Sequence, residues 1–135
     1  MMIRKTSCLL MALVLFQGCA GLGSKSVEER VAQRAQARWD SLVEGDLKTA
    51  YEYLSPGYRQ AKSFERYQRG ILGVGIWQGA KVDKVVCERP EVCKVTVQVS
   101  SRLVVPRVGT PMESTSPVYE RWILEDGQWW HVPNQ

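Results

Sequence analysis

The single histidine of the chain, His131, is the residue best suited to acid–base chemistry. A general base needs a neighbouring group that orients it, and the carboxylates considered for that role are Asp83 and Asp40. No spacing in the sequence links either of them to His131. The alternative is structural: His131 lies opposite Trp122 in a hairpin and packs, half-buried, on its indole. The sequence favours this structural interpretation, and catalysis by His131 stays a hypothesis.

The cysteines offer a second kind of chemistry. Cys87 and Cys93 flank the turn Arg89-Pro90-Glu91, which places them opposite each other in an antiparallel strand pair, close enough for a disulfide. An oxidising compartment favours this bond, and two free buried thiols are the alternative. The chain has no H-x-x-x-H or C-x-x-C spacing and no phosphate-binding loop. We therefore expect no metal site and no cofactor.

The N-terminal segment has the pattern of an export signal. Arg4 and Lys5 precede the uninterrupted apolar run Cys8–Phe16, and small residues follow it, which is the order of a secretory signal peptide. A membrane-spanning helix needs about 20 apolar residues, and this run is about half that length. The sequence therefore predicts export, with a retained transmembrane helix as the weaker alternative.

The segment Leu15–Cys19 resembles the lipobox of bacterial lipoproteins. In that family the cysteine is acylated through its sulfur and the chain is cut just before it. Gly18 supplies the small residue that the peptidase needs, whereas Phe16 stands where Leu is commonest and Gln17 where a small residue is usual. Ordinary signal cleavage after Ala20 is the alternative.

The lipoprotein resemblance has consequences for the whole N-terminal region. It implies a signal peptide over residues 1–18 and a lipidated tether over residues 19–25, anchored in membrane lipid through acylated Cys19. Ala20 follows the cysteine, where an Asp would retain the protein at the inner membrane. The implied location is the periplasmic face of the outer membrane.

Composition and charge narrow the function classes. The 135 residues, 44% hydrophobic and 24% charged, suit one globular domain and are atypical of disorder. Removal of Arg4 and Lys5 with the signal leaves 16 basic against 14 acidic residues, a net charge of +2. No dense basic stripe is present, so we expect no nucleic-acid binding.

Local signals predict helices in the first half of the domain. Ser26 and Glu29 form a capping box, apolar residues recur at helical spacing from Val27, and Gly45 ends this helix. A second helix is predicted from its cap at Asp46 to Ser55-Pro56-Gly57, and a short helix from Ser63 to Gly70. A glycine-rich connector, Gly70–Gly79, follows, and we expect its apolar side chains to pack under a sheet.

The second half of the domain has the alternation of strands. Two Val-rich strands are predicted over Lys81–Glu88 and Val92–Val105, followed by a long loop to Ser116. A final hairpin, Tyr119–Glu125 with Gln128–Val132, turns at Asp126-Gly127. The register of the first pair puts Asp83 on the apolar face, so either a β-bulge turns it outward, which we favour, or it lines a polar cavity.

The order of these elements predicts an α+β domain, with N-terminal helices packed on one face of a curved antiparallel sheet of about four strands. Over residues 26–135 the sequence resembles the NTF2-like (cystatin-like, SnoaL-like) superfamily. The similarity lies in Glu44-Gly45-Asp46, Ala50-Tyr51, Leu54-Ser55-Pro56 and Asp126–Trp130. The resemblance implies a sheet wrapped into a cone around a cavity, and homodimers through the sheet are common in that family.

Four tryptophans are candidates for a ligand or partner surface: Trp77, Trp122, Trp129 and Trp130. Burial in the core is the alternative for most of them, but neighbours in a strand point to opposite faces, so one of the last two is expected to be partly exposed. We interpret the chain as a non-catalytic envelope lipoprotein that binds a small apolar ligand or an envelope protein. A cavity enzyme of isomerase, dehydratase or hydrolase type and a structural partner in an envelope assembly are the alternatives.

Overall fold

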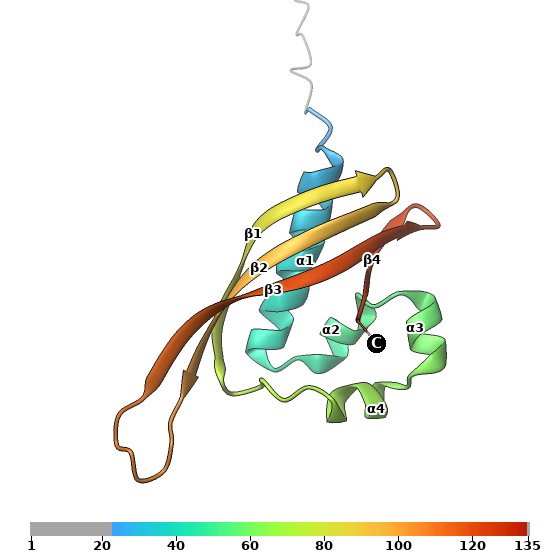
Figure 1. Cartoon of the computed structure of the whole chain (residues 1–135). Helices are drawn as coiled ribbons and strands as arrows, with labels where there is room; N and C mark the ends of the chain where they lie inside the picture. The colour runs from blue at the N-terminus through green and yellow to red at the C-terminus, as the bar shows by residue number, and fades with distance from the viewer. Residues whose placement is uncertain (1–22, 135) are drawn as a thin grey trace, which may run out of the picture.

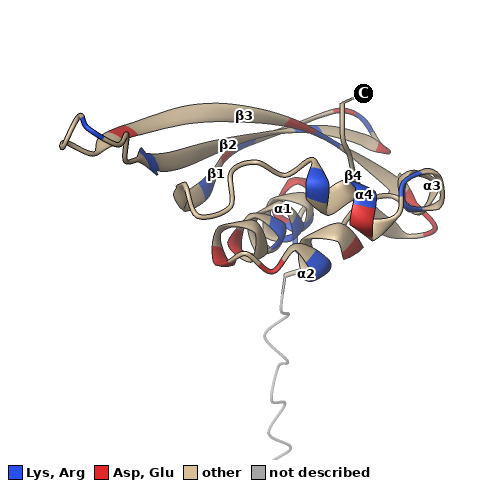
Figure 2. Cartoon of the chain, turned by 90° about the horizontal axis from the view of Figure 1, so that it is seen from below, with Lys and Arg blue, Asp and Glu red and all other residues tan. Residues whose placement is uncertain are grey.

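The structure, a computed structural model, describes residues 23–134. Four helices precede four strands in the sequence, and the two groups form two layers (Figures 1 and 2). The elements are α1 (Val27–Glu44), α2 (Leu47–Glu52), α3 (Pro56–Ala61), α4 (Phe64–Arg69), β1 (Trp77–Arg89), β2 (Val92–Leu103), β3 (Met112–Glu125) and β4 (Gln128–Val132). The predicted α+β class, with helices ahead of a curved sheet, is confirmed.

Helix α1 begins and ends where its local signals predict. The Ser26 side chain accepts a hydrogen bond from the Glu29 N–H, and the Glu29 carboxylate accepts one from the Ser26 N–H. Gly45 terminates the helix with a φ of 81°, which a residue with a Cβ rarely adopts. The buried face of α1 comprises Val31, Ala35, Arg38, Trp39, Ser41 and Leu42. One member of that face, Arg38, is charged and needs a partner inside the domain.

The short helices show one element that the sequence analysis missed. Asp46 caps α2 and Ser63 caps α4, as predicted. Ser55-Pro56-Gly57 was expected only to end a helix, but Ser55 also caps α3 and Pro56 occupies its first position. Proline suits that position because its missing N–H would have no helical partner there. The sequence analysis therefore did not predict α3.

The sheet is a simple antiparallel meander in the order β1-β2-β3-β4, and it curves across α1 (Figure 1). The predicted pairings of Cys87 with Cys93 and of Trp122 with His131 are confirmed. The expected loop up to Ser116 is too long, because β3 already begins at Met112 and pairs with β2 throughout. Pro117 is tolerated there because β4 pairs with β3 only from Arg121 onward, so one edge of β3 is free at Pro117.

A β-bulge resolves the position of Asp83. Val82 pairs with Val97 and Lys84 with Thr96, so Asp83 is the extra residue between two paired positions. Its side chain is exposed. The bulge is the alternative that the sequence analysis favoured, and it keeps the carboxylate out of the apolar face.

The connector before β1 differs from its prediction. Leu72 is 84% exposed and Val74 is also exposed, so these side chains do not tuck under the sheet. Trp77 does pack inward, with its ring 5.3 Å from that of Trp39. A Cβ on Gly73 would lie 1.9 Å from the Trp77 indole, so only glycine lets the connector pass this close.

Candidate functional site

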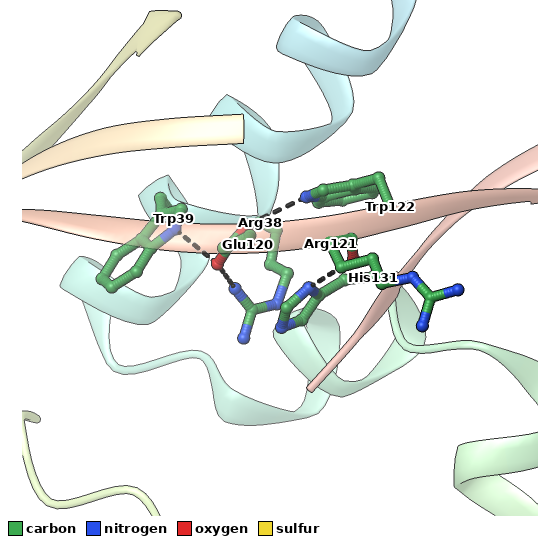
Figure 3. A network of polar contacts seen from close by, with 6 residues as sticks. All are labelled: Arg38, Trp39, Glu120, Arg121, Trp122 and His131. Atoms are coloured by element: carbon green, nitrogen blue, oxygen red, sulfur yellow. Dashed lines mark hydrogen bonds and ion pairs between the residues drawn. The ribbon is translucent and has the colours of Figure 1, made fainter. Parts of the chain in front are cut away.

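The inner face of the sheet holds a charged group, the carboxylate of Glu120 (Figure 3). Glu120 pairs with Val95 across β2 and β3 and is 5% exposed. It accepts hydrogen bonds from the Arg38 guanidinium, from the Trp39 indole N–H at 2.8 Å and from the Trp122 indole N–H at 2.9 Å. These three donors come from α1 and β3, so the carboxylate ties the helix to the sheet.

Arg38 completes the buried ion pair from the helix side. Its Nε atom and the hydroxyl of Tyr67 are buried and have no hydrogen-bond partner within residues 23–134. Burial raises the pKa of Tyr67, while the nearby Arg38 cation works in the opposite direction. The hydroxyl is thus close enough to feel the guanidinium charge without meeting hydrogen-bond geometry.

His131 lies next to this network rather than at an exposed edge. Its ring is buried, its centroid is 5.7 Å from that of Trp122, and its Nδ1 donates to the Arg121 carbonyl at 3.2 Å (Figure 3). Burial, assisted by the Arg38 cation, lowers the pKa of His131 to about 4. The stacking on Trp122 agrees with the structural interpretation, but the burial is deeper than expected.

The backbone around His131 is fixed by the segment between α2 and α3. The His131 N–H donates to the Tyr53 carbonyl at 2.9 Å, and the Ser55 N–H donates to the His131 carbonyl at 3.0 Å. Leu54 forms a parallel bridge with His131. The outer edge of β4 is therefore paired, and the imidazole is held in place from both sides.

The structure does not bring the two candidate aspartates to His131. Asp40 is exposed on α1 and accepts a hydrogen bond from Gln36 at 2.8 Å, and Asp83 is exposed in the bulge of β1. The acidic group that acts on the charge of His131 is Glu120 instead. A base with a pKa near 4 is weak at neutral pH, and the Glu120 carboxylate is already occupied by three donors. The arrangement suits a rigid interior better than proton transfer.

The four candidate tryptophans are largely internal. Trp122 and Trp129 are buried, whereas Trp77 and Trp130 are partly exposed. The adjacent pair therefore behaves as predicted, with Trp129 inside and Trp130 less buried. Trp130 is covered by Arg34 and Arg59, whose guanidinium carbons lie 5.3 and 5.4 Å from its ring centroid. None of the four presents a fully exposed indole.

Two of the surface hollows bear on a possible binding function. A groove of about 520 Å³ runs between the start of α1 and the β3–β4 hairpin, where Trp129 and Leu124 line it together with Arg34. A larger hollow of about 710 Å³ lies over the sheet face turned away from the helices; we call it the outer-face hollow. Its outward side chains include Lys84, Val86, Lys94, Thr96, Tyr119 and Arg121. Tyr119 is 69% exposed there.

The disulfide between Cys87 and Cys93 is present at the end of the β1–β2 hairpin. Cys19 lies outside the described residues. Between residues 23 and 134 no helix is long and apolar enough to cross a membrane, and no group of three or more His, Cys, Asp or Glu side chains could hold a metal ion. No protein-family model matches the sequence, and none of the curated proteins is detectably similar to it.

Proposed function

We propose that this chain is a lipid-anchored envelope protein whose NTF2-like domain is a non-catalytic binding module, and that the outer face of the sheet is its binding surface. The lipobox-like segment Leu15–Cys19 and the export signal before it support the anchor and the location at the periplasmic face of the outer membrane. Helices placed ahead of a curved, open antiparallel sheet support the NTF2-like assignment.

The observation that carries the proposal is the contrast between the two faces of the sheet. On the inner face Glu120 is fully used by Arg38 and two indoles, and His131 is held neutral by burial. On the outer face Tyr119 and Val86 are exposed beside a hollow. Buried polar groups that satisfy one another stabilise a fold, whereas exposed aromatic and apolar groups favour contact with a partner.

The anchor is tested by the intact mass of the protein extracted from native membranes, with and without reductant. We expect an acylated chain that begins at Cys19 and gains the mass of two hydrogens on reduction of the Cys87–Cys93 bond. A Cys19→Ser variant is expected to move from the membrane to the soluble fraction. An unacylated chain that begins at Gly21 would show that the anchor is wrong.

The binding surface is tested by photo-crosslinking in living cells. A crosslinking amino acid replaces Tyr119 in one variant and Gln60, an exposed residue of α3 on the helix layer, in the other. We expect a crosslinked species that forms only from position 119. Equal crosslinking from both positions, or crosslinking from 60 alone, would contradict the assignment of the outer face.

A further inference from the structure

The outer-face hollow combines cations with apolar groups in adjacent rows of the sheet. Lys84, Thr96 and Tyr119 form one row across three strands. The next row places Val86, Lys94 and Arg121 side by side, with Val132 at its end. Val86 is 44% exposed, so the apolar groups between the cations are open to a partner.

The positive charge of the mature protein is concentrated in this hollow. Its lining has four basic residues, Lys84, Arg89, Lys94 and Arg121, and one acidic residue on the same face, Glu88. The Glu120 carboxylate points to the other face and is paired with Arg38. The hollow thus carries +3, whereas residues 19–135 together carry +2, so the remainder of the mature chain is slightly negative.

Most of these cations have no partner of their own. Lys94 pairs with Glu88 at 2.7 Å, but Lys84, Arg89 and Arg121 take part in no salt bridge within residues 23–134. Unpaired surface cations around exposed apolar groups raise the association rate and the specificity for a partner of opposite charge. The surface is therefore complementary to an acidic partner.

Charge and shape argue against two other occupants, a second copy of this chain and an anionic membrane. A two-fold dimer through this face would bring the net positive charge of the hollow against the same positive surface of a second copy, which is repulsive. An anionic membrane supplies the charge, but it offers a broad surface, whereas the cations and Val86 line a hollow. An extended chain segment can enter it, with carboxylates on the cations and apolar side chains on Val86 and Tyr119.

We propose that the outer-face hollow binds an extended acidic segment of a partner protein. This inference rests on the function proposed above. Carboxylates of that segment pair with Lys84, Arg89 and Arg121. Its apolar side chains pack against Tyr119 and Val86, which supply the contact that charge alone does not.

The test uses a chain that begins at Ala20, which keeps the whole core because the buried apolar residues lie between Val31 and Trp129. The probe is a fluorescent peptide of repeated Glu-Glu-Val-Val, which puts a carboxylate and an apolar side chain on each face of an extended chain. A Gln-Gln-Val-Val peptide is the uncharged control. We expect saturable binding of the acidic peptide by anisotropy and at least about tenfold weaker binding of the control.

Charge reversal locates the site. Lys84→Glu with Arg121→Glu is expected to weaken binding of the acidic peptide at least about tenfold, because attraction becomes repulsion. The matched control, Arg66→Glu with Arg69→Glu on α4, makes the same change in net charge away from the hollow and is expected to bind like the parent. Tyr119→Ala is expected to weaken binding without changing its dependence on salt.

Several outcomes would overturn the inference. These are the absence of saturable binding, equal binding of the two peptides, or equal loss in the α4 control. Tighter binding to phosphatidylglycerol vesicles than to the peptide, lost in the hollow variant, would identify a membrane as the occupant. The mass measurement and the crosslinking are independent of the peptide, so the anchor and the binding surface stand if the acidic occupant alone is wrong.

Discussion

At the residue scale, the main polar contact between α1 and the sheet in the interior is the ion pair of Glu120 and Arg38. A carboxylate and a guanidinium are both costly to bury; Glu120 accepts from Arg38 and from two indole N–H groups, and the Arg38 charge is balanced by Glu120. Replacing one partner leaves the opposite charge buried and unpaired. Breaking this pair is therefore expected to cost more stability than breaking a surface salt bridge.

Glu120→Gln is expected to lower the free energy of unfolding by about 3–5 kcal/mol, because the Arg38 charge stays buried without its counter-ion. Urea denaturation followed by tryptophan fluorescence measures the change. Glu113→Gln is the control, since Glu113 is 74% exposed and lies 3.8 Å from Arg102. Its effect is expected to stay within about 0.5 kcal/mol. Equal effects of the two substitutions would contradict a special role for Glu120.

His131 is expected to make the fold acid-sensitive. Because burial lowers its pKa from 6.5 to about 4, the unfolded chain binds more protons at this residue between those pH values, and the free energy of unfolding falls as pH falls. The loss amounts to about 3 kcal/mol from pH 6.5 to below 4. His131→Asn, an amide that does not titrate, is expected to flatten this part of the stability curve. An unchanged curve would show that other groups cause the acid sensitivity.

The two network residues were accessible to sequence analysis one at a time, but their pairing was not. Arg38 falls on the apolar face of α1. Glu120 lies two residues before Trp122, so both side chains point to the inner face of β3. A charged residue in each of two apolar patterns is the signal that could have identified them. Which residue of α1 meets which residue of β3 depends on tertiary packing, and no local signal in the sequence encodes it.

At the scale of the element, prediction succeeded where the cause is local. Capping by Ser26, the αL residue Gly45 and the Asp126-Gly127 turn act within a few residues, so the elements beside them were placed correctly. Helix α3 was missed because Ser55-Pro56 ends one helix and starts another with the same residues. The start of β3 was missed because Pro117 indicates a loop unless the free edge of the sheet is known.

The connector before β1 supplies a sharp test of packing. Gly73→Ala is expected to destabilise the domain by about 1–3 kcal/mol, because the added Cβ collides with the Trp77 ring that packs on Trp39. Gly57→Ala in α3 is the matched control, since its Cβ would meet nothing within 4 Å. It is expected to be stabilising by about 0.5–1 kcal/mol. A neutral Gly73→Ala would show that the Trp77 ring can move aside without loss of packing.

The disulfide of the β1–β2 hairpin closes a short loop, with a sequence separation of 6. Reduction is therefore expected to cost about 2 kcal/mol of unfolding free energy, at the low end of the usual range. Thermal unfolding with and without dithiothreitol measures the loss. A Cys87→Ala, Cys93→Ala variant is expected to be insensitive to dithiothreitol, and sensitivity in that variant would assign the effect to something other than this bond.

The whole molecule is organised around α1. Its N-terminal end lies beside the turns of the β1–β2 and β3–β4 hairpins, while the β2–β3 connection projects at the opposite end (Figure 1). Most of the buried apolar residues belong to one cluster that joins α1 and α2 to the strands; Leu54, Tyr67 and Val92 are buried outside it. The helices cover one face of the sheet only, which leaves the outer face open for the proposed partner.

A single cluster predicts a single transition. Near-ultraviolet signals of the tryptophans and far-ultraviolet signals of the backbone are expected to change at the same urea concentration, because the main cluster includes residues of both the helix layer and the sheet. The chain that begins at Ala20 and the chain extracted in detergent are expected to share that midpoint. Separate transitions for the two signals would show that part of the domain unfolds independently.

The distance along the chain between Arg38 and Glu120, 82 positions, has a consequence for biogenesis. If the protein is exported from its N-terminus, as proposed, Arg38 leaves the translocation channel long before its counter-ion. Closing so long a loop is slow, and until it closes the apolar face of α1 stays exposed to aggregation. A folding helper that shields α1 during translocation is therefore expected to matter more for this domain than its small size suggests.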